Sequence, residues 1–396
     1  MRTLSFAARS LFRQPGRTGL GILGIAAVGA LLFDMLLLSR GLVVSFRDLL
    51  DGIGFDVRVT ATDSPLPGGV RLNDSVSLAS TIAGLPSVDE VVPMRTASGV
   101  LVRTNKPSVS IGLTGMDAGR RRPWTLVSGR EVGTSPSARE VVVNEQVMRD
   151  LDVPLGEQAS IRVECDPGHV APAPLTFTVV GVAQFPFDGE GQGTAATSYA
   201  TLREACGDSR NQADMLMVAS RGTPAETVSA IRASQPEVYA VTNEQIVARM
   251  QAQNFTYFRQ ISAVLSTITL VFGFLLITVL LTVSVNQRLG EIAALRALGF
   301  SRSRAVGDVL AQGAMLITVG GALALPLGLA LSLWLDRILK GMPGIPAALH
   351  FFVFEPRAVV WHVALLVVTA VLASAYPMWL VARLPIATTL RNEVVG

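Results

Sequence analysis

The residues that could catalyse a reaction or bind a metal are few and scattered along this chain. The three histidines, His169, His350 and His362, are far apart and share no zinc-ligand spacing. The sequence contains no GxSxG, HExxH or paired-cysteine motif, and no Walker A pattern for binding ATP. We therefore expect no catalytic residue, no metal site and no bound cofactor. If the protein uses ATP, a separate subunit must bind it.

A glycine-rich segment, Asp188–Thr194 (DGEGQGT), invites comparison with a phosphate-binding loop. Such a loop continues into a lysine followed by serine or threonine, and this segment does not. We interpret it as a flexible connector.

The two cysteines, Cys165 and Cys206, both fall in the long middle region that we place outside the cytoplasm. A disulfide between them is allowed in that compartment. Two buried free thiols are an equal alternative, because buried cysteines often serve as small core residues.

The most informative stretch is the short basic segment from Asn286 to Val306, NQRLGEIAALRALGFSRSRAV. It separates two apolar runs without a charged residue, Gln260–Gln287 and Val309–Leu335. Each run exceeds the roughly 20 apolar residues that cross a bilayer as a helix. The excess of arginine between them indicates the cytoplasmic face. A short helix here, with apolar and basic side chains on one face, is suited to binding a cytoplasmic partner.

Composition supports a membrane protein with four transmembrane helices and a large soluble part. The chain is 50% hydrophobic, with a mean hydropathy of +0.46. Basic residues at the start, in the segment after the second apolar run and at the end agree on one topology, with both termini in the cytoplasm. We expect a multi-pass protein of the inner (cytoplasmic) membrane. The net charge of +3, without a basic stripe, argues against a nucleic-acid partner.

The expected boundaries follow from these runs. They are a cytoplasmic N-terminal segment (1–17), helix 1 (18–39), an extracytoplasmic α+β domain with its stalk (40–257), helix 2 (258–286), a cytoplasmic coupling helix (287–305), helix 3 (306–335), an outer loop (336–357), helix 4 (358–382) and a cytoplasmic tail (383–396). The stalk is expected where helix 2 continues into the polar stretch Gln245–Gln260.

Asp34 interrupts the first apolar run. A carboxylate within a membrane span can take part in proton coupling. It lies about 24 Å along a helix from Thr18, at 1.5 Å per residue. We therefore expect Asp34 near the outer interface, in a structural role.

The region between helices 1 and 2 alternates short strand-like runs with fewer helical ones, which predicts an α+β domain. The predicted strands are Val57–Thr60, Val88–Pro93, Val100–Arg103, Val109–Leu113, Val141–Val143, Ala159–Val163, Thr176–Val182 and Met215–Ala219. The predicted helices are Leu78–Gly84, Asn144–Leu151, Ala225–Ser234 and Asn243–Arg249.

The pattern R-x-x-EIAALRALGFSRSR resembles the cytoplasmic signature of the MacB/FtsX-like (type VII) ABC transporter permeases. The start, ARSLFRQPGRTGLGILGIA, and the end, ARLPIATTLRNE, are also similar to that family, as is the middle stretch SGREVGTSPSAREVVVNEQVMRDLDVPLGEQASIRV. The residues that carry the cytoplasmic signature are Arg288, Glu291, Ile292, Leu295, Arg296, Ala297, Leu298 and Gly299.

The resemblance implies a permease that forms a homo- or heterodimer, with one ABC ATPase subunit bound to each protomer. It implies an outer domain with porter-like lobes and an inserted β lobe. It also implies that the coupling helix docks into the ATPase through Arg288, Glu291, Ile292, Leu295, Arg296, Leu298 and Gly299. Further partners would be membrane lipids and a periplasmic adaptor or substrate protein.

Two functions are compatible with this resemblance. In the first, ATP hydrolysis by the partner drives outer movements that export or extract a lipid, lipoprotein or amphiphile. In the second, the same machine acts as a mechanotransmission protein that controls an extracytoplasmic hydrolase or a sensor. A membrane-anchored enzyme is disfavoured, because the sequence lacks the groups of an active site.

Overall fold

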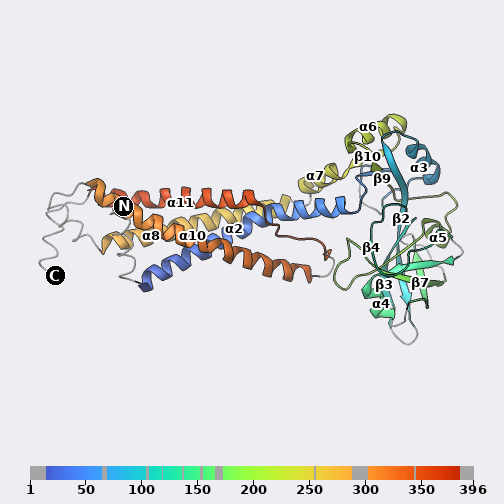
Figure 1. Ribbon diagram of the computed structural model, residues 1–396, viewed down its shortest axis with the longest axis horizontal. Helices are drawn as coiled ribbons and strands as arrows, with labels where there is room; N and C mark the ends of the chain where they lie inside the picture. Colours follow the sequence, from blue (N-terminus) through green and yellow to red (C-terminus); the bar gives the residue numbers. More distant parts are fainter. Residues whose placement is uncertain are drawn as a thin grey trace. The chain divides into compact units, whose positions relative to one another are not determined.

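The computed structural model describes residues 15–64, 69–103, 107–117, 119–135, 138–151, 155–165, 173–253, 256–287, 302–342 and 345–383. The chain divides into two compact units (Figure 1). One comprises Met1–Leu42, Thr256–Arg337 and Phe351–Gly396, and we call it the helical unit. The other comprises Val43–Phe255 and Ile338–His350, and we call it the α+β unit.

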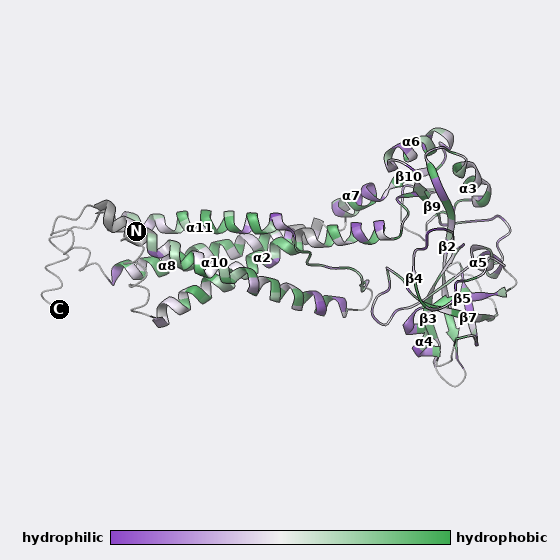
Figure 2. Ribbon diagram, viewed as in Figure 1, coloured by the Kyte–Doolittle hydropathy of each residue, from purple (hydrophilic) through white to green (hydrophobic). Residues whose placement is uncertain are grey.

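Four long helices are apolar and long enough to cross a membrane, as the sequence predicted. They are α2 (Pro15–Gly52), α8 (Thr256–Asn286), α10 (Arg302–Lys340) and α11 (Pro356–Arg383). Hydrophobic residues run along all four helices (Figure 2). A helix satisfies its own backbone hydrogen bonds, which is why these apolar stretches take this form in lipid.

The first helix is longer than predicted. We expected it to end at residue 39, but α2 continues to Gly52 and contributes its last ten residues to the α+β unit. The sequence from Arg40 to Leu50 contains no proline, and the chain turns only at Gly54, where φ is +83°. A polar residue such as Arg40 ends a membrane span without ending a helix, so hydropathy underestimated its length.

Small residues bring α2 and α10 close together. A Cβ atom added to Gly29 would lie 2.7 Å from the Cβ of Ala324, and one added to Gly328 would lie 3.0 Å from the Ala30 carbonyl oxygen. The contacts advance together along both helices, so α2 and α10 run parallel at this interface. Such close approach gives van der Waals contact, which associates helices in lipid where the hydrophobic effect contributes little.

One large sheet forms the centre of the α+β unit, in the strand order β10-β1-β9-β2-β3-β8-β5-β7-β4, with β6 paired to β2 and β7. Its strands are β1 (Val57–Thr60), β2 (Val88–Val102), β3 (Val109–Met116), β4 (Thr125–Gly129), β5 (Glu140–Val143), β6 (Gln158–Glu164), β7 (Leu175–Gln184), β8 (Gly193–Thr197), β9 (Met215–Ser220) and β10 (Tyr239–Thr242). Its helices are α3 (Ser75–Ala83), α4 (Glu145–Leu151), α5 (Tyr199–Ala205), α6 (Pro224–Ser234) and α7 (Asn243–Gln253).

The sheet forms two lobes that share the long strand β2. In the first lobe, β10, β1, β9 and the start of β2 pack against α3 and α6 around Val57, Ile82 and Ile231. In the second, β6 pairs with both β2 and β7, so that β2, β3, β8, β5, β7 and β6 close into a ring. The ring encloses a core that includes Leu101 and Phe177. We call these the open lobe and the ring lobe.

The sequence divided β2 into two strands, Val88–Pro93 and Val100–Arg103, and this was wrong. The polar residues and glycine between them do not resemble a strand, yet Met94–Leu101 pair along their whole length with β3. Gly99 is required here: a Cβ atom would lie 2.6 Å from a methyl group of Leu113 and 3.2 Å from Ile161. The polar stretch that interrupts the hydrophobic pattern is therefore part of the strand, and Gly99 within it packs closely in the ring lobe.

The other predicted strands and helices are present, but β4, β8, β10 and α5 were not predicted. The predicted flexible connector Asp188–Thr194 is also wrong. Its last two residues, Gly193 and Thr194, begin β8, and its first two are held by backbone contacts to Pro346 and Ala347. The stretch expected to form a stalk contains α7, which packs in the α+β unit around Ile246, and the start of α8, which belongs to the helical unit.

The segment between α10 and α11 closes against α2 within the helical unit. The Phe351 amide donates to Asp336 Oδ1 at 2.8 Å. A Cβ atom on Gly41 would lie 2.3 Å from the Phe351 carbonyl oxygen and 2.6 Å from the Val353 nitrogen. Only glycine lets the backbone of this segment lie so close to α2.

Replacing Gly41 by alanine should therefore destabilise the protein by about 1–3 kcal/mol, the usual cost of overpacking. Gly52→Ala is the matched control, because it changes the same helix where nothing lies within 4 Å of the new Cβ. Thermal unfolding of the detergent-solubilised protein, followed by circular dichroism, should show a lower melting temperature for Gly41→Ala alone. Equal melting temperatures for the two variants would contradict the close approach.

Candidate functional site

The predicted coupling helix falls between two membrane helices, as the sequence required. α8 ends at Asn286 and α10 begins at Arg302. Its proposed contact residues lie outside the described residues, so their geometry stays a prediction. They are Arg288, Glu291, Ile292, Leu295, Arg296, Leu298 and Gly299.

Asp34 is enclosed by protein, while its expected depth near the outer interface stays a prediction. Its side chain is fully buried. Ser332 on α10 donates a hydrogen bond from Oγ to Asp34 Oδ1 at 2.6 Å, while Oδ2 has no partner among the described residues. The bond lies one helical turn beyond the contact of Ala30 with Gly328, so it continues the same α2–α10 interface.

A second buried polar side chain in the helical unit is His362 of α11. The residue is fully buried, and within the described part of the chain neither ring nitrogen has a hydrogen-bond partner. Its ring packs edge-on against Phe33, with the centroids 5.4 Å apart. Its ring contributes to the packing of α11 against α2.

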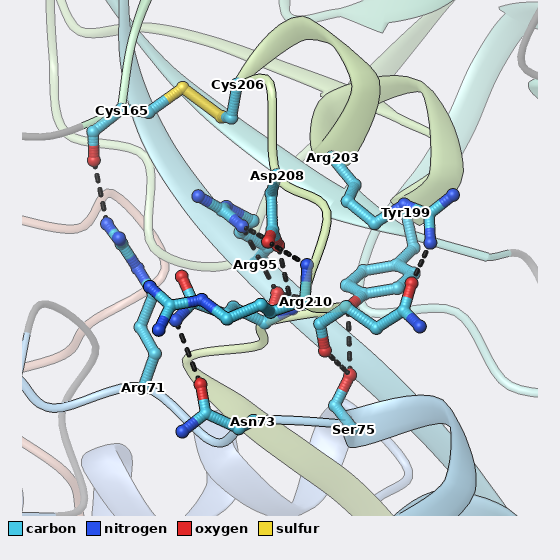
Figure 3. Close-up of polar contacts among 12 residues, drawn as sticks. Arg71, Asn73, Ser75, Arg95, Cys165, Tyr199, Arg203, Cys206, Asp208 and Arg210 are labelled. Carbon is cyan, nitrogen blue, oxygen red and sulfur yellow. Dashed lines mark hydrogen bonds and ion pairs between the residues drawn. A yellow bond between two sulfur atoms is a disulfide. The ribbon is translucent and has the colours of Figure 1, made fainter.

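Within the α+β unit, the two cysteines are joined. The Cys165–Cys206 disulfide has an S–S distance of 2.01 Å and links the end of β6 to the C-terminal end of α5. Of the two alternatives that the sequence left open, a disulfide or two buried free thiols, the structure shows the disulfide. The Cys165 carbonyl accepts a hydrogen bond from Arg71 Nη2 at 2.7 Å (Figure 3).

Two ion pairs surround this disulfide, and with it they form what we call the junction cluster (Figure 3). Arg95 of β2, whose side chain is 2% exposed, donates to Asp208 at 2.5 Å and to the Gln212 carbonyl at 3.3 Å. Arg71 donates to Asp214 at 3.3 Å. Asp214 also accepts from the amide and the hydroxyl of Thr96, at 2.6 and 2.8 Å.

The junction cluster fixes residues 207–214, the connection from α5 of the ring lobe to β9 of the open lobe. The Asp208 carboxylate accepts from the backbone amides of Arg210 and Gln212, at 2.8 and 2.7 Å. Tyr199 donates to the Gln212 carbonyl at 3.0 Å and lies 2.8 Å from the Ser75 hydroxyl. Burial raises the pKa of Tyr199, which keeps it a neutral hydrogen-bond donor. These contacts support a structural joint between the lobes.

The described residues do not offer a catalytic or metal-binding arrangement. No group of three or more His, Cys, Asp or Glu side chains among them could hold a metal ion. The carboxylates of the junction cluster are occupied by arginine and amide donors. Arg58 of β1 is a further buried charge, and desolvation lowers its pKa to about 10, which leaves it protonated at neutral pH. These polar groups of the α+β unit serve packing and ion pairing.

Sequence reasoning missed the junction cluster because its partners are distant in the chain. Arg95 and Asp208 are separated by 113 residues, and Arg71 and Asp214 by 143. The one local signal was an arginine, Arg95, between two predicted strands. A buried arginine in a strand needs a carboxylate partner, but the sequence does not identify which one.

Asp34 and Ser332 should be energetically coupled. A double-mutant cycle with Asp34→Ala and Ser332→Ala should give a coupling energy of about 1 kcal/mol, typical of interhelical hydrogen bonds in membranes. Asp34→Asn keeps an acceptor for the Ser332 hydroxyl and should preserve stability. Unfolding of the solubilised variants measures the coupling, and a value of zero would contradict the bond. Loss of activity in Asp34→Asn at unchanged stability would instead indicate proton coupling.

Removing the disulfide should lower the stability of the α+β unit by about 4 kcal/mol, from the chain entropy of a loop of this length. The two cysteines are 41 residues apart. Cys165→Ser/Cys206→Ser and the chemically reduced wild type should show the same loss in urea unfolding. If the oxidised and reduced proteins unfold at the same urea concentration, the bridge does not stabilise the junction cluster.

Two family comparisons cover most of the chain. Residues 18–234, more than half of it, match the MacB-like periplasmic core domain, and residues 263–386 match the FtsX-like permease C-terminal domain. No curated protein sequence matches the chain.

Solved structures resemble the chain at low identity. The periplasmic region of MacB from Actinobacillus actinomycetemcomitans has a TM-score of 0.37 and 16% identity, and the match covers 52% of this chain and 97% of that one. The extracellular domain of the noncanonic ABC-type transporter YknZ from Gram-positive bacteria has a TM-score of 0.35 and 15% identity, covering 47% and 98%. A domain of a putative permease protein from Porphyromonas gingivalis has a TM-score of 0.29 and 14% identity, covering 48% and 88%.

The two family matches lie where the fold requires them. The periplasmic core match begins in α2 and ends at the end of α6, and the permease match spans α8, α10 and α11. Their order agrees with four membrane helices and an α+β unit between the first two. The chain is a membrane protein that belongs to the MacB/FtsX-like family of ABC transporter permeases.

Proposed function

We propose that this chain is the permease subunit that couples ATP hydrolysis, carried out by a separate ABC ATPase subunit, to movement of its α+β unit outside the cytoplasmic membrane. That movement exports or extracts a lipid, lipoprotein or amphiphile. ATP binds to the partner subunit, and the permease itself holds no cofactor. The protein lies in the inner (cytoplasmic) membrane with both termini in the cytoplasm.

The observation that supports this proposal most strongly is the placement of the segment Arg288–Gly299. It lies between α8 and α10, two helices that can cross a membrane, and so it emerges at one membrane face. Its arginines favour the cytoplasmic face, where ATP is available. A short helix that carries both charged and apolar side chains at that face is suited to binding a soluble subunit.

The described residues also favour mechanical work over transport through the permease. The buried interfaces of the helical unit are rich in small and apolar residues, and its buried Asp34 already accepts a hydrogen bond from Ser332. A solute pathway through a membrane would require a series of polar side chains lining it. We therefore assign the work to the α+β unit, on substrates that reach it from the membrane surface or the outer compartment.

The assembly that we propose contains two permease protomers, identical or different, with one ATPase subunit on each. α8 and α11 present many exposed apolar side chains, among them Phe272, Val279, Val367 and Leu372. Lipid covers such side chains in a membrane protein, and a second protomer would cover part of them. A periplasmic adaptor or a substrate protein would bind the α+β unit.

Charge reversal in the coupling helix tests the proposal. Glu291→Arg should uncouple the permease from its ATPase, with a loss of at least about 1.4 kcal/mol or tenfold in binding, because buried charge pairs at interfaces tolerate such changes poorly. The measurements are ATPase binding and permease-stimulated ATP hydrolysis in reconstituted vesicles. Membrane insertion should be unchanged.

Two controls separate this effect from general damage. Glu237→Arg makes the same change in charge at an exposed position of the α+β unit and should leave ATPase binding intact. Gly299→Pro should uncouple the ATPase as Glu291→Arg does, whereas Gly299→Ala should be milder, because only proline removes a backbone donor. If Glu291→Arg and Glu237→Arg bind the ATPase equally well, the segment does not dock into it.

A further inference from the structure

The segment that joins α10 to α11 makes specific contacts with the ring lobe. Ile338–His350 belong to the α+β unit, although both flanking helices belong to the helical unit. The Ala347 amide donates to the Asp188 carbonyl at 2.7 Å, and Pro346 forms an isolated antiparallel bridge with Gly189. We call Ile345–His350 the docking loop.

The surface that receives the docking loop is a tight turn. Within Gly189–Gln192, the Gln192 amide donates to the Gly189 carbonyl at 3.1 Å, and Gly191 at the third position has a φ of +74°. A positive φ there is the mark of a type II turn, which strongly favours glycine. The Gln192 side chain accepts from the Gly189 amide at 3.2 Å and braces the turn. Gly191 of DGEGQGT thus serves turn geometry, while Gly193 begins β8.

Asp188 connects this turn to α4 through Asn144. Asn144 Nδ2 donates to the Asp188 carboxylate at 2.7 Å and to the Gln192 carbonyl at 2.7 Å. Asn144 Oδ1 accepts from the Val147 amide at 3.0 Å, which caps the first turn of α4. Asn144 is buried, and desolvation raises the pKa of Asp188 while its hydrogen bonds from Thr194 and Asn144 oppose the shift. Three successive hydrogen bonds therefore join the docking loop to α4. Ala347 donates to Asp188, Asn144 donates to Asp188, and Val147 of α4 donates to Asn144.

The docking loop is also anchored at its other end. The His350 amide donates to Ser45 Oγ on α2 at 2.7 Å, and Lys340 Nζ lies 2.8 Å from His350 Nδ1. The loop itself is a turn, since the Leu349 amide donates to the Pro346 carbonyl at 2.9 Å. With anchors at Ser45, Lys340 and Asp188, it has little freedom to move independently of the turn that it contacts.

We propose that the docking loop carries movements of α10 and α11 directly to the ring lobe. Asp188 and Asn144 are positioning residues for this transmission, because they hold the Asp188–Gln192 turn that the docking loop contacts. This inference rests on the proposed function, because it needs an ATPase partner to drive the helices. It adds a route into the ring lobe, whereas Ile246 and Val247 of α7 pack with Leu50 of α2 and with Val241 of the open lobe.

A single substitution can remove the hydrogen bond from the Ala347 amide to the Asp188 carbonyl without truncating a side chain. Ala347 occupies the second position of the turn Pro346–Leu349, where proline is favoured. Ala347→Pro therefore suits the turn but deletes the amide that donates to Asp188. Ala347→Ser keeps this amide and is the matched control. Asp188→Ala and Asp188→Asn form a second pair, in which only asparagine keeps an acceptor for Asn144.

The experiment is hydrogen exchange of the full permease–ATPase complex, measured by mass spectrometry without nucleotide and with ATP plus orthovanadate. Without nucleotide, Ala347→Pro should exchange roughly fivefold faster than Ala347→Ser over 188–194, the effect of losing about one hydrogen bond. With ATP and orthovanadate, exchange in both α4 and α7 should change in the wild type and in Ala347→Ser. In Ala347→Pro and Asp188→Ala the response of α4 should be lost, whereas that of α7 should persist.

The outcomes separate this inference from the proposed function. If α4 still responds in Ala347→Pro, or if α7 alone responds in the wild type, the docking loop does not transmit movement and the inference is overturned. If neither α4 nor α7 responds although the partner traps nucleotide, the mechanical function fails, and the inference with it. Equal exchange of Ala347→Pro and Ala347→Ser over 188–194 would show that the contact itself is absent.

Discussion

A polypeptide can cross a bilayer only where its backbone N–H and C=O groups are bonded within the segment, and this constraint underlies the whole structure. Four apolar stretches meet it as helices α2, α8, α10 and α11. With four spans, the α+β region and the loop after α10 must emerge on the same face, and the segment after α8 on the other. The assignment of Ile338–His350 to the α+β unit agrees with this alternation, since it groups two parts of the chain that are 83 residues apart (255 to 338).

Properties that depend on neighbouring residues were predicted well from the sequence. Apolar runs gave the four helices, and valine-rich stretches gave most of the strands. Properties that depend on distant residues were not. β8 is a strand because small residues fit between β3 and β5, and Arg95 is buried because Asp208 lies beside it. The Asp188–Gln192 turn was taken for a flexible connector because its partners, Asn144 and Ala347, are far away in the sequence.

The α+β unit is built to keep its two lobes together. β2 runs through both, and the junction cluster ties the chain between α5 and β9 with a disulfide and two ion pairs. A buried arginine such as Arg95 costs stability unless a carboxylate is held beside it, so the cluster specifies one arrangement of this connection. This arrangement agrees with the proposed function, in which the α+β unit moves and a separate subunit hydrolyses ATP.

The measurement that tests this account most directly is affinity purification of the full protein in a mild detergent, followed by identification of its partners and their stoichiometry. The account predicts one subunit with a Walker A motif for each permease protomer. An ATPase that co-purifies in equal amount would establish the energy source and leave the substrate as the remaining question. If no ATPase is recovered in any of several mild detergents, the central claim is wrong, and the α+β unit should be studied as a receptor.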